Sequence, residues 1–174
     1  MSAEALAKNI RVLVLDVDGV LTDGGLYYDS AGKISKRFNV QDGLGIKLAQ
    51  AAGLEIAVIS GLDSKAVESR VRELEIEHYY AGRLEKIPLL DKILAAKGLE
   101  YSNLAYLGDD WVDAGPMRVV GLPMAVANAQ PEIKDMAVWV SEAHGGHGAV
   151  REAVNFILKA QGKLDALWRE WDKG

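Results

Sequence analysis

The residues most able to do chemistry are aspartates that close a strongly apolar run. The stretch VLVLDVDGVLTDGG (12–25) places Asp16, Asp18 and Asp23 in and just after a series of valines and leucines. Burying an unpaired carboxylate is unfavourable, so such a group is normally excluded, protonated or paired with a cation. Side chains two apart on an extended backbone point the same way, and Gly19 permits a tight exit from a strand. We therefore expect Asp16 and Asp18 to project together from a strand end, beside a compensating cation.

Other predicted strand ends and helix starts also carry groups that could bind phosphate or a cation. These groups are the hydroxyl of Ser60 and the backbone N–H of Gly61 after EIAVI, the ammonium of Lys86 before Pro88, and the carboxylates of Asp109, Asp110 and Asp113 after NLAYLG. A proline suits the first turn of a helix, so Lys86 is expected at a helix start, from which its ammonium can reach the end of the sheet.

The acidic cluster predicts a magnesium site. Adjacent carboxylates repel one another by roughly 4 kcal/mol at about 4 Å and an effective dielectric of about 20. The chain has no cysteine and three histidines that are not closely spaced with other ligands, so the donors are hard oxygen atoms, which favour Mg²⁺ over zinc or copper. Mg²⁺ keeps coordination positions open for phosphate oxygens. An acid cluster with a serine and a lysine therefore indicates phosphoryl transfer.

Alternating strand and helix patterns position these groups. Apolar runs predict strands at 11–16, 55–60, 77–81, 103–109, 122–127 and 137–141, and helical patterns lie at about 43–53, 63–75, 88–98, 111–120, 131–136 and from 148 onward. Continuous apolar strands between helices are typical of a parallel sheet covered on both faces. We predict a doubly wound, Rossmann-like α/β fold with a mostly parallel sheet, in one domain over 1–174 with a C-terminal helical tail at about 149–174. Ligands of such a sheet bind beyond the carboxyl ends of its strands.

One segment interrupts the alternation. GGLYYDSAGKISKRFNV (24–40) offers LYYD and KISKRF as two strands around a DSAGK turn, which predicts an inserted β-hairpin at about 24–38. The hairpin is either a surface decoration or a functional flap. We favour the flap because the hairpin directly follows the carboxylate cluster.

The composition is that of an ordinary soluble globular protein and argues against several classes of function. The net charge of −5 speaks against a nucleic-acid-binding face, which needs clustered lysine and arginine. No apolar run approaches the roughly 20 residues of a membrane helix. The start, MSAEALAKNIR, does not resemble a secretory signal, and the absence of cysteine excludes disulfides and thiolate chemistry. We predict a cytoplasmic protein with no nucleic-acid or membrane partner.

The sites together resemble the four motifs of the haloacid dehalogenase superfamily of phosphatases. DVDGVLTD, the strand-end Ser60, Lys86 and GDDWVD stand in the expected order, each with its own strand. FNVQDGLGIK, the hairpin before it and GGHGAVRE near the end are similar to the capless subfamily of 3-deoxy-D-manno-octulosonate 8-phosphate (KDO 8-phosphate) phosphatases. This resemblance covers nearly the whole chain and implies hydrolysis of a small phosphorylated sugar acid in lipopolysaccharide precursor synthesis.

The resemblance implies a role for each motif. Asp16 would attack phosphorus in line to form an aspartyl-phosphate, and Asp18 would act first as general acid and then as general base. Mg²⁺ would be held by Asp16, Asp109 and the backbone carbonyl of Asp18. The phosphoryl oxygens would be bound by Ser60, Gly61 and Lys86, and the substrate site as a whole would comprise Asp18, Asn39, Val40, Gln41, Asp42, Gly43, Lys47, Gly61, Arg70 and Lys86.

Two positions depart from the subfamily pattern. Leu62 stands where an arginine usually follows the glycine of the second motif, and a leucine cannot pair with a substrate carboxylate. His147 stands where arginine is common, in the stretch HGGHG (144–148), which is more typical of a flexible glycine loop near the substrate than of a metal site. Because of Leu62, the substrate stays open between KDO 8-phosphate, a nine-carbon ulosonate 9-phosphate, a nucleotide and another sugar phosphate.

Several acids have simpler alternative interpretations. Asp23 is more typical of a turn before the paired glycines than of a functional acid. Asp110 and Asp113 either suit the dipole of a helix start or support Lys86 and the metal. Asp42 either caps the helix that follows it or contacts the substrate, and the two roles are compatible.

The motif spacing leaves no room for the cap domain that usually excludes water in this superfamily. Only 41 residues separate Asp18 from Ser60, and 22 separate Lys86 from Asp109. The site would be open in a monomer, so either a macromolecular substrate or a second subunit would cover it, and the hairpin offers apolar side chains for assembly. The resemblance implies a homotetramer in which hairpins join and a neighbour's carboxyl-terminal segment approaches the active site.

A non-enzymatic alternative is a receiver-like phospho-signalling module. Such a module also combines clustered aspartates, a serine or threonine, a lysine and Mg²⁺ on a doubly wound sheet. It pairs adjacent acids after its first strand and is phosphorylated after its third. In this chain the acids are spaced as DVD on the first strand and adjacent as DD late in the sequence, which favours the phosphatase.

Overall fold

The computed structural model describes residues 1–173, and its centre is a six-stranded sheet. Every neighbouring pair of strands is parallel. In spatial order the strands are β5 (His78–Tyr80), β4 (Glu55–Ile59), β1 (Val12–Leu15), β6 (Leu104–Gly108), β7 (Leu122–Ala125) and β8 (Trp139–Val140). The chain winds outward from β1 in both directions, so the carboxyl end of β1 is the switch point at which such sheets bind ligands.

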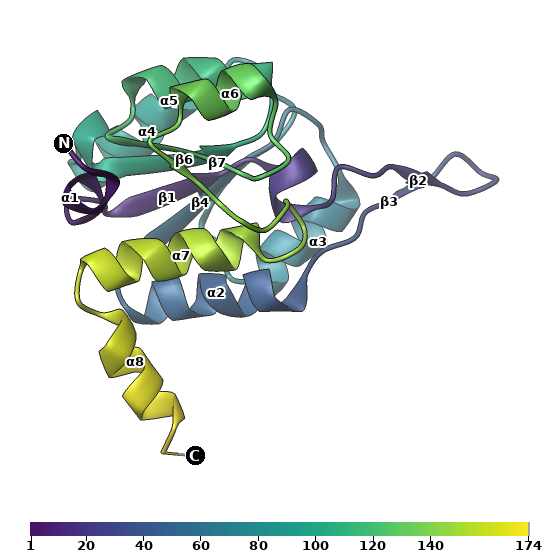
Figure 1. The fold of residues 1–174 in the computed structure, drawn as a ribbon. Coiled ribbons are helices and arrows are strands. Elements are labelled where there is room, and N and C mark those ends of the chain that lie inside the picture. Colours follow the sequence, from purple (N-terminus) through teal and green to yellow (C-terminus); the bar gives the residue numbers. More distant parts are fainter. Residues whose placement is uncertain (174) are drawn as a thin grey trace.

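Helices cover both faces of this sheet (Figure 1). On one face lie α4 (Ile87–Lys97), α5 (Ala114–Val119) and α6 (Pro131–Met136), and on the other lie α2 (Val40–Ala51), α3 (Lys65–Glu73) and α7 (Ala149–Ala160). Because both faces are covered, every residue of β1 and of β6 is buried. This burial explains why the strands appear in the sequence as continuous apolar runs rather than as alternating ones.

The predicted α/β fold with its mostly parallel sheet is confirmed, and each of the six predicted strands contains the observed one. The helices differ from the prediction in four places. Helix α2 begins at Val40, three residues before its predicted start. The helix α1 (Ala3–Ala7), capped by the hydroxyl of Ser2, was not predicted. The pattern at 111–120 begins as a 3₁₀ turn before α5. The predicted tail divides into α7 and α8 (Leu164–Trp171), because Gly162 adopts a left-handed φ of +70° between them.

The α8 helix extends away from the sheet at the end of the chain (Figure 1). Its Trp168 and Trp171 are 67% and 60% exposed. Together with Leu44 and Leu48 of α2, they line a cavity of about 140 Å³. None of the helices within residues 1–173 is both long and apolar enough to cross a membrane.

The predicted hairpin is present and projects away from the body of the molecule (Figure 1). Its strands β2 (Tyr27–Tyr28) and β3 (Ile34–Ser35) are antiparallel, and the carboxylate of Asp29 accepts two backbone N–H groups across the turn. A bridge between Thr22 and Phe38 closes its base. Apart from this hairpin, the described chain has only helices and short connections between its strands, so it has no cap domain.

Candidate active site

A tight turn after β1 contains Asp18, and Asp16 immediately precedes it. It spans Val17–Leu21 and closes with a hydrogen bond from Thr22 N to the carbonyl of Val17 (3.0 Å). Gly19 adopts a left-handed φ of +87°, and a Cβ there would lie 2.0 Å from Oδ2 of Asp109. The ends of β1 and β6 therefore approach this closely only because residue 19 lacks a side chain.

Lys86 lies buried immediately before α4, and its ammonium reaches the end of the sheet as predicted. Its Nζ lies 2.7 Å from Oδ1 of Asp16 and 2.7 Å from Oδ1 of Asp113. The third partner is the hydroxyl of Tyr106, at 3.0 Å. A buried ammonium requires such partners, because an unpaired charge in the interior is strongly unfavourable.

Asp113 is completely buried and all of its carboxylate oxygens are occupied. Oδ1 accepts from Lys86 and, at 2.7 Å, from the Tyr106 hydroxyl. Oδ2 accepts from the backbone N–H groups of Asp109 (2.9 Å) and Asp110 (3.3 Å). Of the two roles considered for Asp113, the structure therefore shows the support of Lys86.

Two further acids with open roles, Asp110 and Asp23, are cap and turn residues. The carboxylate of Asp110 accepts the N–H of Trp111 at 2.7 Å and caps the 3₁₀ turn. The carboxylate of Asp23 accepts the N–H of Gly25 at 2.9 Å, as expected of a turn residue before the paired glycines. Neither side chain contacts Lys86 within residues 1–173.

The pKa values indicate that the negative charge of the aspartates exceeds the positive charge of Lys86. Burial raises the pKa of Asp16 to about 6; the charge of Asp113 adds to the rise and that of Lys86 opposes it. Burial first, and then the charges of the neighbouring carboxylates, Asp16 foremost, together raise the pKa of Asp109 to about 8. For Lys86, burial alone would lower the pKa, but Asp16 and Asp113 raise it above its ordinary value. The cluster thus carries negative charge that one ammonium does not balance.

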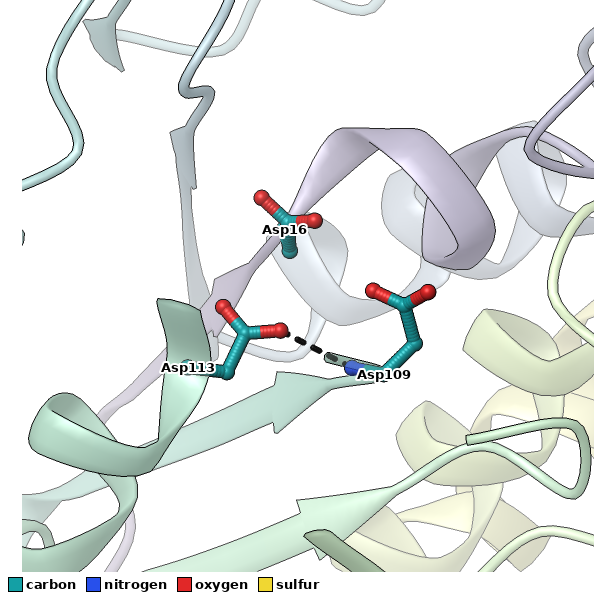
Figure 2. A group of neighbouring side chains, drawn as sticks. All are labelled: Asp16, Asp109 and Asp113. Atoms are coloured by element: carbon teal, nitrogen blue, oxygen red, sulfur yellow. Dashed lines mark hydrogen bonds between the residues drawn. The ribbon is translucent and has the colours of Figure 1, made fainter. Parts of the chain in front are cut away.

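Figure 2 shows the carboxylates of Asp16, Asp109 and Asp113 facing a common space. Each offers an oxygen that lies within 4.8 Å of the others. Asp113 has no oxygen to spare, whereas Asp16 uses only Oδ1 for Lys86 and the side chain of Asp109 forms no hydrogen bond to the described residues. Hard oxygen donors with uncompensated charge fit Mg²⁺, so Asp16 and Asp109 are the side chains suited to hold it, with Asp113 as their support.

A cavity of about 200 Å³ opens above these carboxylates. It is lined by Asp16, Asp18, Gly61, Leu62, Leu84, Asp109, Asp110 and Val112. Ser60 follows β4 directly, as predicted, but it is buried and its hydroxyl is engaged locally. Its Oγ donates to the carbonyl of Leu62 (2.9 Å) and accepts the N–H of the same residue (3.2 Å).

Asp16 and Asp18 line the same cavity, as expected from their spacing, but different lysines hold them. Lys86 binds Asp16 from the end of the sheet. Lys36, which directly follows β3, binds Oδ1 of Asp18 with its Nζ at 2.5 Å. The two acids thus have separate surroundings although only one residue stands between them.

Part of the predicted substrate set gathers at the start of α2. Asn39 caps this helix, because its Oδ1 accepts the N–H of Gln41 at 2.7 Å. Arg70 of α3 donates to the backbone carbonyl of Asn39 at 3.4 Å. A Cβ on Gly43 would lie 2.1 Å from a guanidinium nitrogen of Arg70, so the glycine lets the Arg70 side chain lie against α2. Val40 is 80% exposed.

Two other predicted substrate residues are engaged elsewhere. Of the two roles left open for Asp42, capping of the helix is not observed, because Asn39 caps α2 and Asp42 lies in its first turn. The buried carboxylate of Asp42 instead accepts N–H groups at the start of α7, including that of Arg151 at 2.9 Å. Lys47 pairs with the exposed Glu75 at 2.5 Å.

The HGGHG loop packs against the turn after β1. A Cβ on Gly145 would lie 1.7 Å from the carbonyl oxygen of Gly19, so the glycine allows two backbones to meet. Arg37 of the hairpin donates to the carbonyl of Gly146 at 3.1 Å and lies 3.4 Å from Nε2 of His147. These glycines thus permit a close backbone approach, and the flexibility of the loop stays a prediction.

Sequence reasoning missed two polar residues at the site, Tyr106 and Lys36. Tyr106 is the one residue of β6 with a polar side chain, and a buried hydroxyl in an apolar strand requires a partner. Lys36 lies in KISKRF, the second strand of the predicted hairpin, and it was not singled out although a functional flap was favoured for this segment. The available signal was that the hairpin directly follows the carboxylate cluster.

Comparisons with known proteins agree with this geometry. The KDO 8-phosphate phosphatase KdsC of Escherichia coli strain K12 is 45% identical over 167 residues, covering 95% of this chain and 89% of its own length. The chain belongs to this phosphatase family. No protein-family model matches it. The family's place in the haloacid dehalogenase superfamily confirms the resemblance noted in the sequence.

Solved structures of the family have the same fold. A crystal structure from Moraxella catarrhalis, in complex with magnesium ion, phosphate ion and KDO, superposes with a TM-score of 0.94 at 37% identity and covers 97% of each chain. The enzyme of Yersinia pestis superposes with a TM-score of 0.92 at 40% identity, covering 94% of this chain and 88% of its own.

Proposed function

We propose that this chain is a Mg²⁺-dependent phosphatase that hydrolyses KDO 8-phosphate to KDO and inorganic phosphate. The observation that carries the proposal is the environment of Asp16. Lys86 holds one oxygen of this carboxylate at 2.7 Å, and the residue lines the cavity at the switch point of the sheet. A carboxylate fixed in this way is arranged for in-line attack on phosphorus.

In the first step Asp16 forms a bond to phosphorus while the bond from phosphorus to the sugar oxygen breaks. Asp18, at the same cavity, donates a proton to the departing oxygen, so the sugar leaves as an alcohol. Lys86 neutralises part of the negative charge beside Asp16.

In the second step Asp18 takes a proton from water, whose oxygen attacks phosphorus and releases Asp16 as a free carboxylate. Mg²⁺, which Asp16, Asp109 and the backbone carbonyl of Asp18 would hold, supplies charge neutralisation at the phosphoryl oxygens when bound. We assign phosphoryl binding to the N–H of Gly61 and to Lys86. Ser60 joins them if its hydroxyl leaves its local bond to Leu62.

A nine-carbon ulosonate 9-phosphate stays open as a second candidate substrate because of Leu62. Leu62 is 50% exposed and lines the cavity beside Asp16 and Asp18. Its side chain provides no charge for a substrate carboxylate, so recognition of the sugar acid must come from other residues, and we propose Asn39, Gly43 and Arg70 for this role.

We further propose that the enzyme works as a cytoplasmic homotetramer. The hairpin presents Leu26, Tyr27 and Tyr28, which are 44%, 52% and 63% exposed. An apolar patch of this kind supports association between hairpins. Sedimentation that shows a fully active monomer would contradict the tetramer.

The function is tested by phosphate release from KDO 8-phosphate, a nine-carbon ulosonate 9-phosphate and other sugar phosphates. Wild type and Asp16→Asn are each measured with Mg²⁺ and with a chelator. We expect release that depends on Mg²⁺ and falls by at least about a thousandfold in the variant, because the nucleophile is lost. Release from none of the esters, or full activity in the variant, would refute the proposal. A preference for another sugar phosphate would change only the substrate.

A further inference from the structure

Lys36 contacts the Asp18 carboxylate from the base of the hairpin. Its Nζ donates to Oδ1 of Asp18 at 2.5 Å, and its side chain is 1% exposed. A lysine side chain is seldom buried to this extent, because its charge must leave water and requires a partner. Here the partner is the carboxylate of Asp18, which carries out both proton transfers of the proposed reaction.

The contact with Lys36 is the hydrogen bond that fixes the Asp18 side chain. Between residues 1 and 173, its carboxylate has no other hydrogen-bonding partner. The side chain is 30% exposed at the cavity, where an aspartate has several accessible rotamers. Lys36 restricts these rotamers by binding Oδ1, and it leaves Oδ2 available to the substrate.

The base of the hairpin, where Lys36 lies, is packed against the body of the protein. Two residues further on, Phe38 pairs with Thr22 and packs against the hydrophobic core. Lys36 also lies beside Ala66 and Ser69 of α3, with which it lines a groove of about 340 Å³. The hairpin base thereby places the ammonium of Lys36, and this ammonium in turn holds the carboxylate of Asp18.

Two other roles for this ammonium fit the structure less well. Phosphoryl binding is assigned to Lys86, which lies beside Asp16. Binding of the substrate carboxylate, for which Leu62 is unsuited, would require an ammonium that is free, whereas that of Lys36 is engaged by Asp18.

We propose that Lys36 is a positioning residue that orients Asp18 for proton transfer to the leaving sugar oxygen. This inference rests on the proposed phosphatase function and adds to it a residue of the hairpin. The hairpin thus contributes to the chemistry within its own chain, in addition to any part it takes in assembly.

The test compares kcat/KM for three phosphate esters. KDO 8-phosphate and glucose 6-phosphate release alcohols that need a proton, whereas p-nitrophenyl phosphate releases a stabilised phenolate that does not. The value of kcat/KM reports on binding and on the steps up to release of this group, so it excludes the second step, in which Asp18 acts as a base. Only KDO 8-phosphate carries a carboxylate, which separates substrate binding from proton transfer.

The variants are Lys36→Met, Lys36→Arg and, as the matched control, Lys33→Met. Lys33 is an exposed lysine of the same hairpin with no ion pair to Asp18. We expect Lys36→Met to lower kcat/KM about tenfold or more for both sugar phosphates, and by less than about threefold for p-nitrophenyl phosphate. Lys36→Arg, which keeps the charge, should recover most of the activity, and Lys33→Met should match wild type.

An equal loss on all three esters would overturn the proposal. A loss confined to KDO 8-phosphate would also overturn it, because Lys36 would then bind the substrate carboxylate. Wild type that is inactive on all three esters would instead refute the phosphatase function itself. Thermal unfolding and sedimentation verify the fold and assembly of each variant, and Lys36→Gln is measured and judged in the same way if Lys36→Met does not fold.

Discussion

Replacing Asp113 with asparagine should weaken the buried cluster beneath the reacting carboxylates. Each oxygen of Asp113 accepts two hydrogen bonds, one pair from Lys86 and Tyr106 and the other from backbone N–H groups. Asparagine has one acceptor oxygen, and its NH₂ group only donates. In either orientation, the amide nitrogen therefore faces at least one donor that it cannot satisfy.

The magnitude of the effect follows from the lost hydrogen bonds. A hydrogen bond to a charged group contributes about 1.5–3 kcal/mol, so losing two removes about 3–6 kcal/mol. Part of this loss is recovered, because Asp113 also repels Asp16 and Asp109 and raises the pKa of each. We expect the free energy of unfolding to fall by about 3 kcal/mol, which for a chain of this size lowers Tm by about 6–12 °C.

Thermal unfolding at saturating Mg²⁺, followed by circular dichroism, measures this effect. Asp110→Asn is the matched control, because Asp110 is exposed and asparagine caps a helical turn as well as aspartate does. The control should change the free energy of unfolding by no more than about 0.5 kcal/mol. If Asp113→Asn unfolds at the same temperature as Asp110→Asn, the hydrogen bonds of the buried carboxylate do not stabilise the fold.

Two further predictions concern the metal. With its pKa raised to about 8 in the metal-free protein, Asp109 is mostly protonated below that pH, and Mg²⁺ must displace the proton. The dissociation constant for Mg²⁺ should therefore rise about tenfold for each pH unit below 8, with about one proton released on binding near pH 7. Titration calorimetry in two buffers measures both quantities. A Mg²⁺ affinity that is unchanged between pH 6.5 and 8 would contradict this prediction. Gly19→Ala should weaken Mg²⁺ binding and phosphatase activity by at least about tenfold. The new Cβ would lie 2.0 Å from Oδ2 of Asp109 and would force this carboxylate to move, and alanine would have to adopt an unfavourable positive φ. Ala31→Gly on the exposed hairpin turn is the control for backbone change, and wild-type Mg²⁺ affinity in Gly19→Ala would show that the turn tolerates a side chain.

The fold was predictable because its determinants are local in the sequence. Strands buried on both faces appear as continuous apolar runs such as VLVL (12–15), and the helices between them follow a different spacing. The ends of these strands also located Asp16, Lys86 and Asp109, because a parallel sheet brings all its carboxyl ends to one edge. No side-chain contact was needed for either prediction.

Partners from distant parts of the chain were not predictable in this way. Asp42 looks like a cap for the helix that follows it, but its partners at α7 are more than 100 residues away. Lys36 looks like any exposed lysine of a hairpin, although its side chain is buried against Asp18. In both cases the type of side chain indicates which kind of partner it needs. Which residue supplies that partner depends on how the helices and strands pack.

The distribution of charge also explains why the cluster binds a metal and does not rely on lysines alone. Lys36 is committed to Asp18, and Lys86 is shared between Asp16 and Asp113. Within residues 1–173 no lysine or arginine pairs with Asp109, and its pKa of about 8 is higher than the value of about 6 for Asp16, which does have such a partner. A third lysine would compensate Asp109 permanently and would leave no site for a cation that also binds phosphate. An uncompensated Asp109 makes the balance of charge at the site dependent on Mg²⁺ and the phosphoryl group together.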